Sequence, residues 1–382
     1  MILAGEPSGD VHASALVKEI KKIEPDAKIS GMGGMNMMSA GVDLFYPIDR
    51  LSAMGLTEVL LQMKYIKQAF NEFKAQLKKN KPDLLILIDY PGFNLRAAKF
   101  AKEHFQIKII YYITPKVWAW NSGRLYRMKS ILDHAALIFP FEERLYKKAG
   151  IPATYVGNPL VDDIVETRTP SPGFPALADR SRSSNPDKDL TIGILPGSRK
   201  AEVDNLLEIM LLAGGLIHQQ YKNTRFLVSC ADSVSPEKIR NMVKFHNSGN
   251  IFEIVTGHPR KIFQKADLLI AASGTVTLEA ALYRVPTILI YKMSFVSYRL
   301  AKILVKVKYA GLANIIMGRE VMPELLQQDA TPLNIYAKAK DMLKDLPEYA
   351  RALGGVKKLL GPPGASKRAA QMAVTIARGL RS

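Results

Sequence analysis

The sequence holds one cysteine among 382 residues, which excludes an intrachain disulfide and fits a reducing compartment. Cys230 ends an apolar run of strand length, where a free cysteine usually serves as a small buried hydrophobic residue. The six histidines show no metal-ligand spacing, so we expect no metal centre. No apolar run approaches the roughly 20 residues of a membrane-spanning helix, and we expect no signal peptide.

Two glycine turns fall short of the common nucleotide-binding motifs. The opening AGEPSGD (4–10) follows a very short first strand and is not GxGxxG. The turn LPGSR (195–199) lacks the Lys-Ser/Thr pair of a P-loop, which argues against a P-loop nucleotidase. Its glycine still lets the backbone approach an anion, and Arg199 can bind phosphate oxygens with its forked side chain. Glu202 offers this arginine an ion-pair partner along the same helix.

Negative charge is scarce, which leaves a net charge of +18 and a pI near 9.7. Such a chain favours a negatively charged partner, namely nucleic acid, an anionic membrane face or phosphorylated substrates. No nucleic-acid motif accompanies the charge, so we expect the membrane surface and no nucleic acid. Two basic amphipathic stretches, 56–81 and 298–309, could lie in an anionic interface. For either stretch alone, an ordinary helix with a solvated lysine face is the better interpretation, and it is the net charge of the chain that favours the membrane.

Short apolar runs alternate with helical patterns in two series, which predicts an α/β protein with parallel sheets. Between the series, residues 167–188 are rich in Pro, Ser and charge and indicate a linker. We predict two Rossmann-like, doubly wound domains, at residues 1–165 and 166–345. A C-terminal helical segment, 346–382, is expected to cross back to the first domain.

Ligands of such sheets bind beyond the carboxyl ends of the strands. Four turns fall there, two from each domain, and they predict a cleft between two facing domains. They are residues 4–10, 88–94, 195–202 and 272–279.

The stretch 267–291 has the pattern strand, glycine turn, helix, strand. The turn Ser273-Gly274-Thr275 leaves backbone N–H groups free at a helix start, which suits an anion. Glu279 lies one turn further along the same face and suits sugar hydroxyls. The alternative is an ordinary β-α-β turn with a solvated glutamate.

Asp89 ends the buried run KPDLLILID (81–89), at the place where a general base is expected. Partial burial would raise its pKa toward useful values. The alternative is an aspartate that caps the next helix, expected to begin near Asn94. Trp118 and Trp120 follow another strand and form either an aromatic wall for sugars and acyl chains or ordinary core.

Together, these motifs resemble those of the lipid-A-disaccharide synthases, a family of GT-B glycosyltransferases. The resemblance covers nearly the whole chain, and its motifs occur in the family's order. They are AGEPSGD (4–10), MGLTEVL (54–60), IDYPGFN (88–94), TPKVWAW (114–120), FPFE (139–142), LPGSRKAEV (195–203), ASGTVTLEAAL (272–282) and NIIMGREVMPELLQ (314–327).

The resemblance implies transfer of diacylglucosamine from its UDP donor to 2,3-diacylglucosamine 1-phosphate, giving a β-1,6 disaccharide and UDP. It implies an inverting reaction without metal or cofactor. Asp89 would be the general base, and Ser8 and Asp10 would face the reacting sugars. The remaining assignments concern the UDP donor. Its diphosphate would lie on the two glycine turns, at Gly197, Ser198, Arg199, Ser273, Gly274 and Thr275. Glu279 would bind the ribose, and Asn314 would lie near the nucleotide.

Acylated, charged substrates imply a cytoplasmic enzyme bound peripherally to the inner membrane of a Gram-negative bacterium. The oligomeric state is left open, with a homodimer among the options. Contact with membrane or acyl chains is assigned to apolar residues of MGLTEVL and basic residues of 298–309. They are Met54, Leu56, Val59, Leu60, Arg299, Lys302 and Lys306.

The sequence departs from the family's pattern at two positions. Asn158 stands where relatives often have histidine, and Lys116 stands where a small or amide residue is commoner. Two other functions stay open at this point. One is a different GT-B enzyme, such as a UDP-GlcNAc epimerase or a polyprenyl-linked sugar transferase. The other is a non-enzymatic protein that binds membrane or nucleic acid through charge alone.

Overall fold

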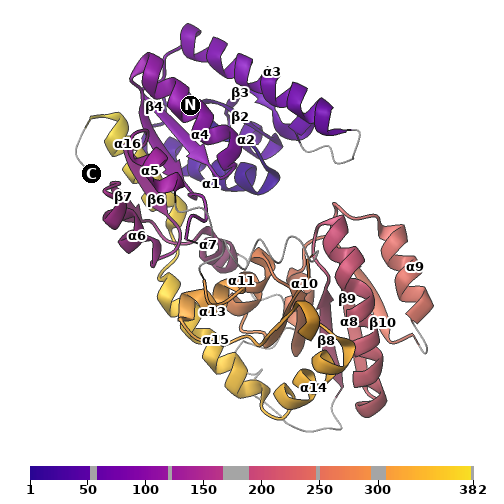
Figure 1. Ribbon diagram of the computed structural model, residues 1–382. Helices are drawn as coiled ribbons and strands as arrows, with labels where there is room; N and C mark the ends of the chain where they lie inside the picture. The colour runs from indigo at the N-terminus through magenta and orange to yellow at the C-terminus, as the bar shows by residue number, and fades with distance from the viewer. Residues whose placement is uncertain (52–57, 119–122, 167–188, 247–249, 294–306, 380–382) are drawn as a thin grey trace. The chain divides into compact units, whose positions relative to one another are not determined.

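The computed structural model describes residues 1–51, 58–118, 123–166, 189–246, 250–293 and 307–379 (Figure 1). Several residues singled out in the sequence lie outside this part of the chain. They are the linker 167–188, Met54, Leu56, Trp120, Arg299, Lys302 and Lys306. The side chains of Val59 and Leu60 also lie outside it. Among the described helices, none combines the length and the apolar content that crossing a bilayer requires.

The chain divides into two compact units, each with its own parallel sheet. Unit 1 comprises Met1–Glu166 together with Leu360–Ser382, and unit 2 comprises Thr167–Leu359. The C-terminal helices are therefore shared between the units: α15 (Leu346–Leu360) belongs to unit 2 up to its last residue, and α16 (Ala365–Ala377) belongs to unit 1.

The sheet of unit 1 has seven strands in the order β3-β2-β1-β4-β5-β6-β7. Every neighbouring pair is parallel. The strands are β1 (Ile2–Ala4), β2 (Ser30–Gly33), β3 (Asp43–Pro47), β4 (Leu84–Ile88), β5 (Lys108–Tyr112), β6 (His134–Leu137) and β7 (Ala153–Tyr155). The helices that join them are α1 (Pro7–Ile23), α2 (Met35–Ser39), α3 (Glu58–Lys79), α4 (Pro91–Phe105), α5 (Arg124–Lys129), α6 (Glu142–Ala149) and α7 (Pro159–Glu166), with a 3-10 turn at Ile48–Leu51.

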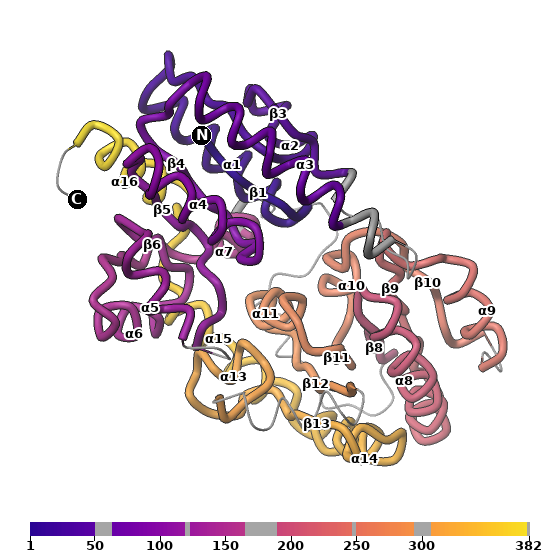
Figure 2. The backbone as a smooth tube through the Cα atoms, turned by 45° about the horizontal axis from the view of Figure 1, so that its top comes forward, coloured from indigo at the N-terminus to yellow at the C-terminus, as the bar shows by residue number. Residues whose placement is uncertain are grey.

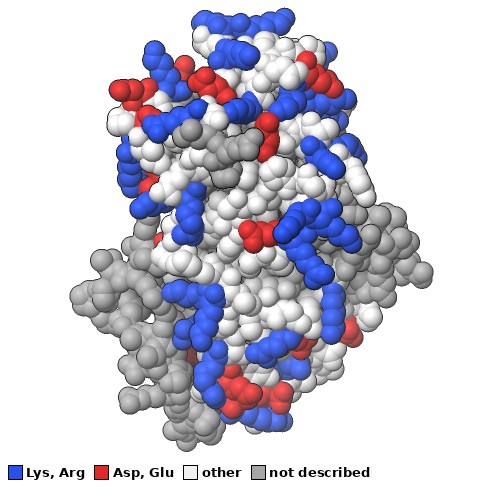
Figure 3. All heavy atoms as spheres, turned by 90° about the vertical axis from the view of Figure 1, so that its left-hand side faces the viewer, with Lys and Arg blue, Asp and Glu red and all other residues white. Residues whose placement is uncertain are grey.

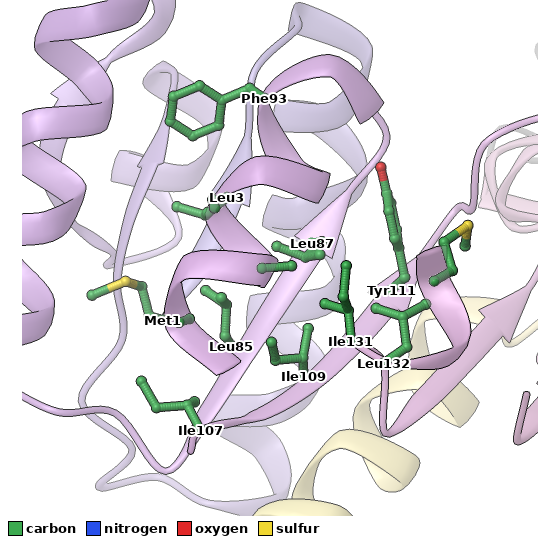
Figure 4. Packing of buried hydrophobic residues seen from close by; sticks show 14 of the residues in the cluster. Met1, Leu3, Leu85, Leu87, Phe93, Ile107, Ile109, Tyr111, Ile131 and Leu132 are labelled. Atoms are coloured by element: carbon green, nitrogen blue, oxygen red, sulfur yellow. The ribbon is translucent and has the colours of Figure 1, made fainter. Parts of the chain in front are cut away.

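Alternating side chains of the central strands supply two apolar cores, one on each face of the sheet. Figure 4 shows one face, where the strand residues pack against Phe93 of α4 and against Ile131 and Leu132. The strand residues on this face are Leu3, Leu85, Leu87, Ile109 and Tyr111. Their neighbours in sequence, Ile2, Ala4, Ile86, Ile88, Ile110 and Tyr112, pack on the other face with residues of α1 and α16.

Helix α16 returns to the N-terminal elements, where it packs against α1 (Figure 2). Its alanine-rich face lets the two helices approach closely, and Ala369, Ala370 and Ala373 are buried there. The last helix of the sequence thus completes the core of the first unit.

The sheet of unit 2 has six strands in the order β10-β9-β8-β11-β12-β13, again all parallel. The strands are β8 (Leu190–Leu195), β9 (Thr224–Cys230), β10 (Phe252–Thr256), β11 (Leu268–Ala272), β12 (Thr287–Tyr291) and β13 (Glu324–Leu326). The helices are α8 (Lys200–Gln220), α9 (Pro236–His246), α10 (Arg260–Lys265), α11 (Thr275–Leu282), α13 (Leu312–Met317), α14 (Pro332–Met342) and α15, with a 3-10 turn at Gln327–Asp329.

The predicted α/β class with parallel sheets is confirmed. Cys230 is 2% exposed, as expected of a buried apolar cysteine. Two strands were not predicted, β3 and β13, and both lie at sheet edges. Edge strands are short and only half buried, so they lack the continuous apolar run that marks the central strands.

Candidate functional site

The turn after β4 holds Asp89 in an unusual backbone conformation. Asp89 and Tyr90 both have a φ of +46°, in the left-handed region that costs a non-glycine residue about 1–3 kcal/mol. Two buried side chains hold this turn through the main-chain oxygen of Asp89: the Tyr111 hydroxyl and the Asn94 side-chain nitrogen each donate to it at 2.7 Å. The same Asn94 nitrogen also donates to the oxygen of Ile88 at 3.1 Å.

The turn after β1 fits against this strained turn. A Cβ atom on Gly5 would lie 2.0 Å from a ring carbon of Tyr90, so only glycine leaves room for the ring. Tyr90 in turn stacks on Phe93, with ring centroids 6.1 Å apart. Because β1 and β4 are paired neighbours, AGEPSGD and IDYPGFN meet at one edge of the sheet.

Asp89 is half buried, and burial is the main cause that raises the pKa of its carboxyl group. A hydrogen bond from the Tyr90 backbone and the charges of Lys116 and His12 work in the opposite direction. Burial also lowers the pKa of His12, while the charges of Asp89 and Asp162 oppose that shift. Helix α4 begins at Pro91 with Tyr90 as its N-cap and without a side-chain capping bond, so Asp89 is no helix cap.

The two other residues expected to face the sugars have different surroundings. Ser8 is exposed in the first turn of α1. Asp10 is 3% exposed, and its carboxylate accepts hydrogen bonds from Gly34 N, Asn36 N, Asn36 Nδ2 and Met37 N at 2.7–3.0 Å. The structure thus gives Asp10 a structural role at the start of α2, because both of its oxygens are already engaged.

Another buried carboxylate lies at the same edge of unit 1, and the sequence analysis assigned it no role. Glu142, the first residue of α6, is 1% exposed. It accepts hydrogen bonds from Trp118 Nε1 at 3.0 Å and from Phe139 N at 3.1 Å. Burial raises the pKa of Glu142 to about 7, although these hydrogen bonds and the charge of Lys116 act to lower it. The Trp118 ring also meets Phe141 edge-on, so it packs within this loop cluster.

In unit 2, the LPGSR turn follows β8. Gly197 has a φ of +110°, and a Cβ atom there would lie 2.4 Å from Glu202 Oε2. Glu202 accepts hydrogen bonds from the N–H groups of Ser198 and Arg199 at 3.2 and 3.3 Å. The predicted pair between Arg199 and Glu202 is confirmed at 3.4 Å, with the Arg199 side chain 77% exposed.

The ASGTVTLE turn follows β11, which pairs directly with β8, so both turns lie at one edge of the sheet of unit 2. Gly274 and Thr275 are exposed where α11 begins. The Ser273 hydroxyl donates to Ala310 O at 3.1 Å. The Glu279 side chain is 15% exposed, and one of its oxygens lies 3.8 Å from His258 Nε2.

Asn314 is fully buried and holds a network behind this turn. Its side chain donates to Met322 O and Glu324 Oε1, both at 2.7 Å, and accepts from Val321 N and Met322 N. Glu324 accepts from the N–H groups of Ala310 and Gly311. Asn314 therefore positions the segment that receives the Ser273 hydroxyl, and the structure shows it as an anchor of this turn.

Four residues of these sites were not assigned from the sequence: Tyr111, Asn94, Glu142 and Glu324. Three of them lie inside motifs that the sequence analysis quoted, but a motif does not show which groups these side chains bond to. Among the described residues, no group of three or more His, Cys, Asp and Glu side chains is arranged to hold a metal ion.

Several solved structures have the same arrangement of strands and helices as this chain. A putative UDP-N-acetylglucosamine 2-epimerase from Listeria monocytogenes matches with a TM-score of 0.67 and 13% identity, covering 100% of this chain and 97% of that chain. MurG from Acinetobacter baumannii matches with a TM-score of 0.60 and 16% identity, covering 98% of each chain. At such identities the likeness shows the fold alone, and the chain has a GT-B-like fold.

The model of the lipid-A-disaccharide synthetase family matches residues 1–360. The chain belongs to this family, and it is a glycosyltransferase of lipid A biosynthesis. Lipid-A-disaccharide synthase 1 of Legionella pneumophila is 38% identical over 353 residues, which cover 92% of this chain and 90% of the relative. Lipid-A-disaccharide synthase of Syntrophus aciditrophicus is 37% identical over 380 residues, covering 98% and 97%. The resemblance inferred from the motifs is confirmed.

Proposed function

We propose that Asp89 is the general base of an inverting displacement. In this reaction the acceptor's 6-hydroxyl oxygen attacks the anomeric carbon of UDP-diacylglucosamine, and the bond from that carbon to the diphosphate breaks. The hydroxyl proton passes to Asp89, and the bonding electrons leave with UDP. The acceptor is diacylglucosamine 1-phosphate, and the new linkage is β-1,6.

The observation that carries this proposal is the setting of Asp89. A half-buried carboxylate at the carboxyl end of a central strand, on a strained turn held by two buried donors, is poised for proton transfer. Its raised pKa makes it a better proton acceptor than an exposed aspartate.

Unit 2 would hold the UDP part of the donor. The turns at 197–199 and 273–275 follow paired strands and offer exposed groups to a diphosphate, and Arg199 would add a forked positive charge. Positive groups fixed there stabilise the charge that develops as UDP leaves. Glu279, partly buried one turn into α11, would accept hydrogen bonds from the ribose.

The test combines turnover with UDP binding. Asp89→Asn should abolish disaccharide formation while calorimetry shows UDP binding unchanged. Arg199→Ala should weaken UDP binding about ten- to hundredfold, as loss of a charged hydrogen bond predicts. Arg240→Ala is the matched control, because Arg240 is an exposed arginine on α9 of the same unit. Full activity of Asp89→Asn would contradict the proposed base.

We also propose that the enzyme works in the cytoplasm on an anionic membrane face, where its acylated substrates reside. The net charge of +18 supports this, and on the face shown in Figure 3 Lys and Arg side chains are more frequent than Asp and Glu. Replacing Arg299, Lys302 and Lys306 with Gln should reduce sedimentation with anionic vesicles and leave that with neutral vesicles unchanged. Equal sedimentation of the variant and the wild type would refute this surface.

A further inference from the structure

Lys116 lies at the tip of a tight turn that follows β5. Its neighbours on both sides, Pro115 and Val117, are buried, and Val117 N donates to Pro115 O at 2.6 Å across the turn. Thr114, one residue earlier, is also buried. The lysine side chain alone is exposed, so the fold anchors its backbone and presents its charge to solvent.

The position of the turn puts this charge beside the proposed base. Strand β5 lies between β4 and β6, so its turn lies between the one that carries Asp89 and the one that leads to Glu142. The charge of Lys116 acts on both carboxylates and favours their ionised forms. Yet within the described part of the chain, no carboxylate lies within the 4.0 Å of an ion pair with Lys116.

We propose that Lys116 binds the phosphate of the acceptor sugar. This inference rests on the proposed role of Asp89, because it places the acceptor's 6-hydroxyl at that carboxylate. In a hexopyranose 1-phosphate, the carbon that bears the phosphate and the carbon that bears the 6-hydroxymethyl group both flank the ring oxygen. An acceptor whose 6-hydroxyl meets Asp89 can therefore reach the adjacent turn with its phosphate, and an ammonium group there can bind it as a point charge.

A second role for Lys116 must be separated from this one. Its charge could act only on Asp89, by holding the base in its ionised form. In that case the phosphate of the acceptor would be irrelevant to any effect of replacing the lysine. The two roles therefore differ in how the effect depends on the acceptor.

The experiment compares diacylglucosamine 1-phosphate with unphosphorylated diacylglucosamine as acceptors. Lys116→Met should raise the KM for the phosphorylated acceptor about ten- to hundredfold, as loss of one charged hydrogen bond predicts. It should leave kcat/KM for the unphosphorylated acceptor and the KM for the donor within about twofold. Lys116→Arg should recover most of the loss. Lys148→Met, an exposed lysine in the last turn of α6, is the matched control.

Inhibition by glucosamine 1-phosphate supplies a second measurement that does not need the unphosphorylated acceptor to react. The wild type should be inhibited more strongly by glucosamine 1-phosphate than by glucosamine, and Lys116→Met should remove that preference. Equal losses with both acceptors, together with a shifted acidic limb of the pH profile, would overturn the proposal, and so would an unchanged KM. Disaccharide formation by the Asp89→Asn variant would contradict the proposed general base, and that outcome is distinct from those that test Lys116.

Discussion

The hydroxyl group of Tyr111 donates a 2.7 Å hydrogen bond to the main-chain oxygen of Asp89. The two residues are 22 positions apart in sequence: Tyr111 lies on β5, and Asp89 directly follows the neighbouring strand β4. Figure 4 shows Tyr111 rising from β5 among the apolar residues of the core, with its oxygen at the end of the ring. A side chain of the apolar core thus fixes the backbone of the turn that carries the proposed base.

We expect Tyr111→Phe to lower kcat about tenfold with little change in either KM, because the variant loosens the turn without touching a substrate. The free energy of unfolding should fall by about 1 kcal/mol for the lost hydrogen bond. Steady-state kinetics and thermal unfolding measure the two effects. Tyr146→Phe is the control, because Tyr146 is equally buried, whereas the hydrogen bonds to the Asp89 main-chain oxygen come from Tyr111 and Asn94. A kcat loss of similar size in both variants would contradict the role of Tyr111.

Gly5→Ala should disrupt the same turn from the other side. The added methyl group would overlap the Tyr90 ring at 2.0 Å, so the ring and the strained backbone must move. We expect a loss of about 1–3 kcal/mol in unfolding free energy and a marked loss of activity. Gly92→Ala provides the comparison, since a Cβ atom there meets nothing within 4 Å in the first turn of α4. That variant should be neutral or slightly stabilised.

Asp89→Asn should be more stable than the wild type at neutral pH, although it is inactive. Burial raises the pKa of Asp89, so the folded state binds its proton more tightly than the unfolded chain does. The protonated form therefore contributes stability that is present below the unfolded pKa near 3.8 and is lost as the pH rises through the folded value. Denaturant unfolding between pH 3 and 8 should show the advantage of Asn growing with pH. A difference in unfolding free energy between the two proteins that does not vary with pH would count against a raised pKa of Asp89.

The environment of Trp118 should titrate with Glu142. The pKa of about 7 means that this carboxyl group changes charge near neutrality, and it accepts the Trp118 Nε1–H bond directly. Lys116, Tyr146 and Tyr155 are the ionisable groups that act on it from neighbouring elements. In Trp120→Phe protein, tryptophan emission should change with a midpoint near pH 7. Adding Glu142→Gln to this variant should abolish the change in emission. Emission of the Trp120→Phe protein that does not vary with pH would refute the coupling between Trp118 and Glu142.

Local patterns were sufficient to predict the central strands and the turns at their carboxyl ends. A parallel strand buried on both faces is a continuous apolar run, and Asp89 and Ser273 follow such runs directly. The ends of paired parallel strands lie together, so the placement of these turns followed from topology. The edge strands β3 and β13 carry a weaker signal and were not predicted.

The roles of single polar side chains could not be read in the same way. Asp10 bonds to the start of α2 more than 20 positions later, and nothing near it in sequence shows that its oxygens are occupied. Asn314 likewise finds its partners through the fold of residues 321–324. A motif shows that a polar residue matters, whereas only the tertiary contacts separate an anchor from a reacting group.

The return of α16 to unit 1 sets an order of events during synthesis. Unit 2 is continuous in sequence, so its folding needs no residue beyond 359. Unit 1 must wait, because one face of its sheet and the flank of α1 are covered by residues from 365 onward. Until then Leu16, Val17 and Ile20 lack the α16 side of their core. The first half of the chain to be made is therefore the last to close, and a nascent chain arrested before α16 should need chaperone protection there.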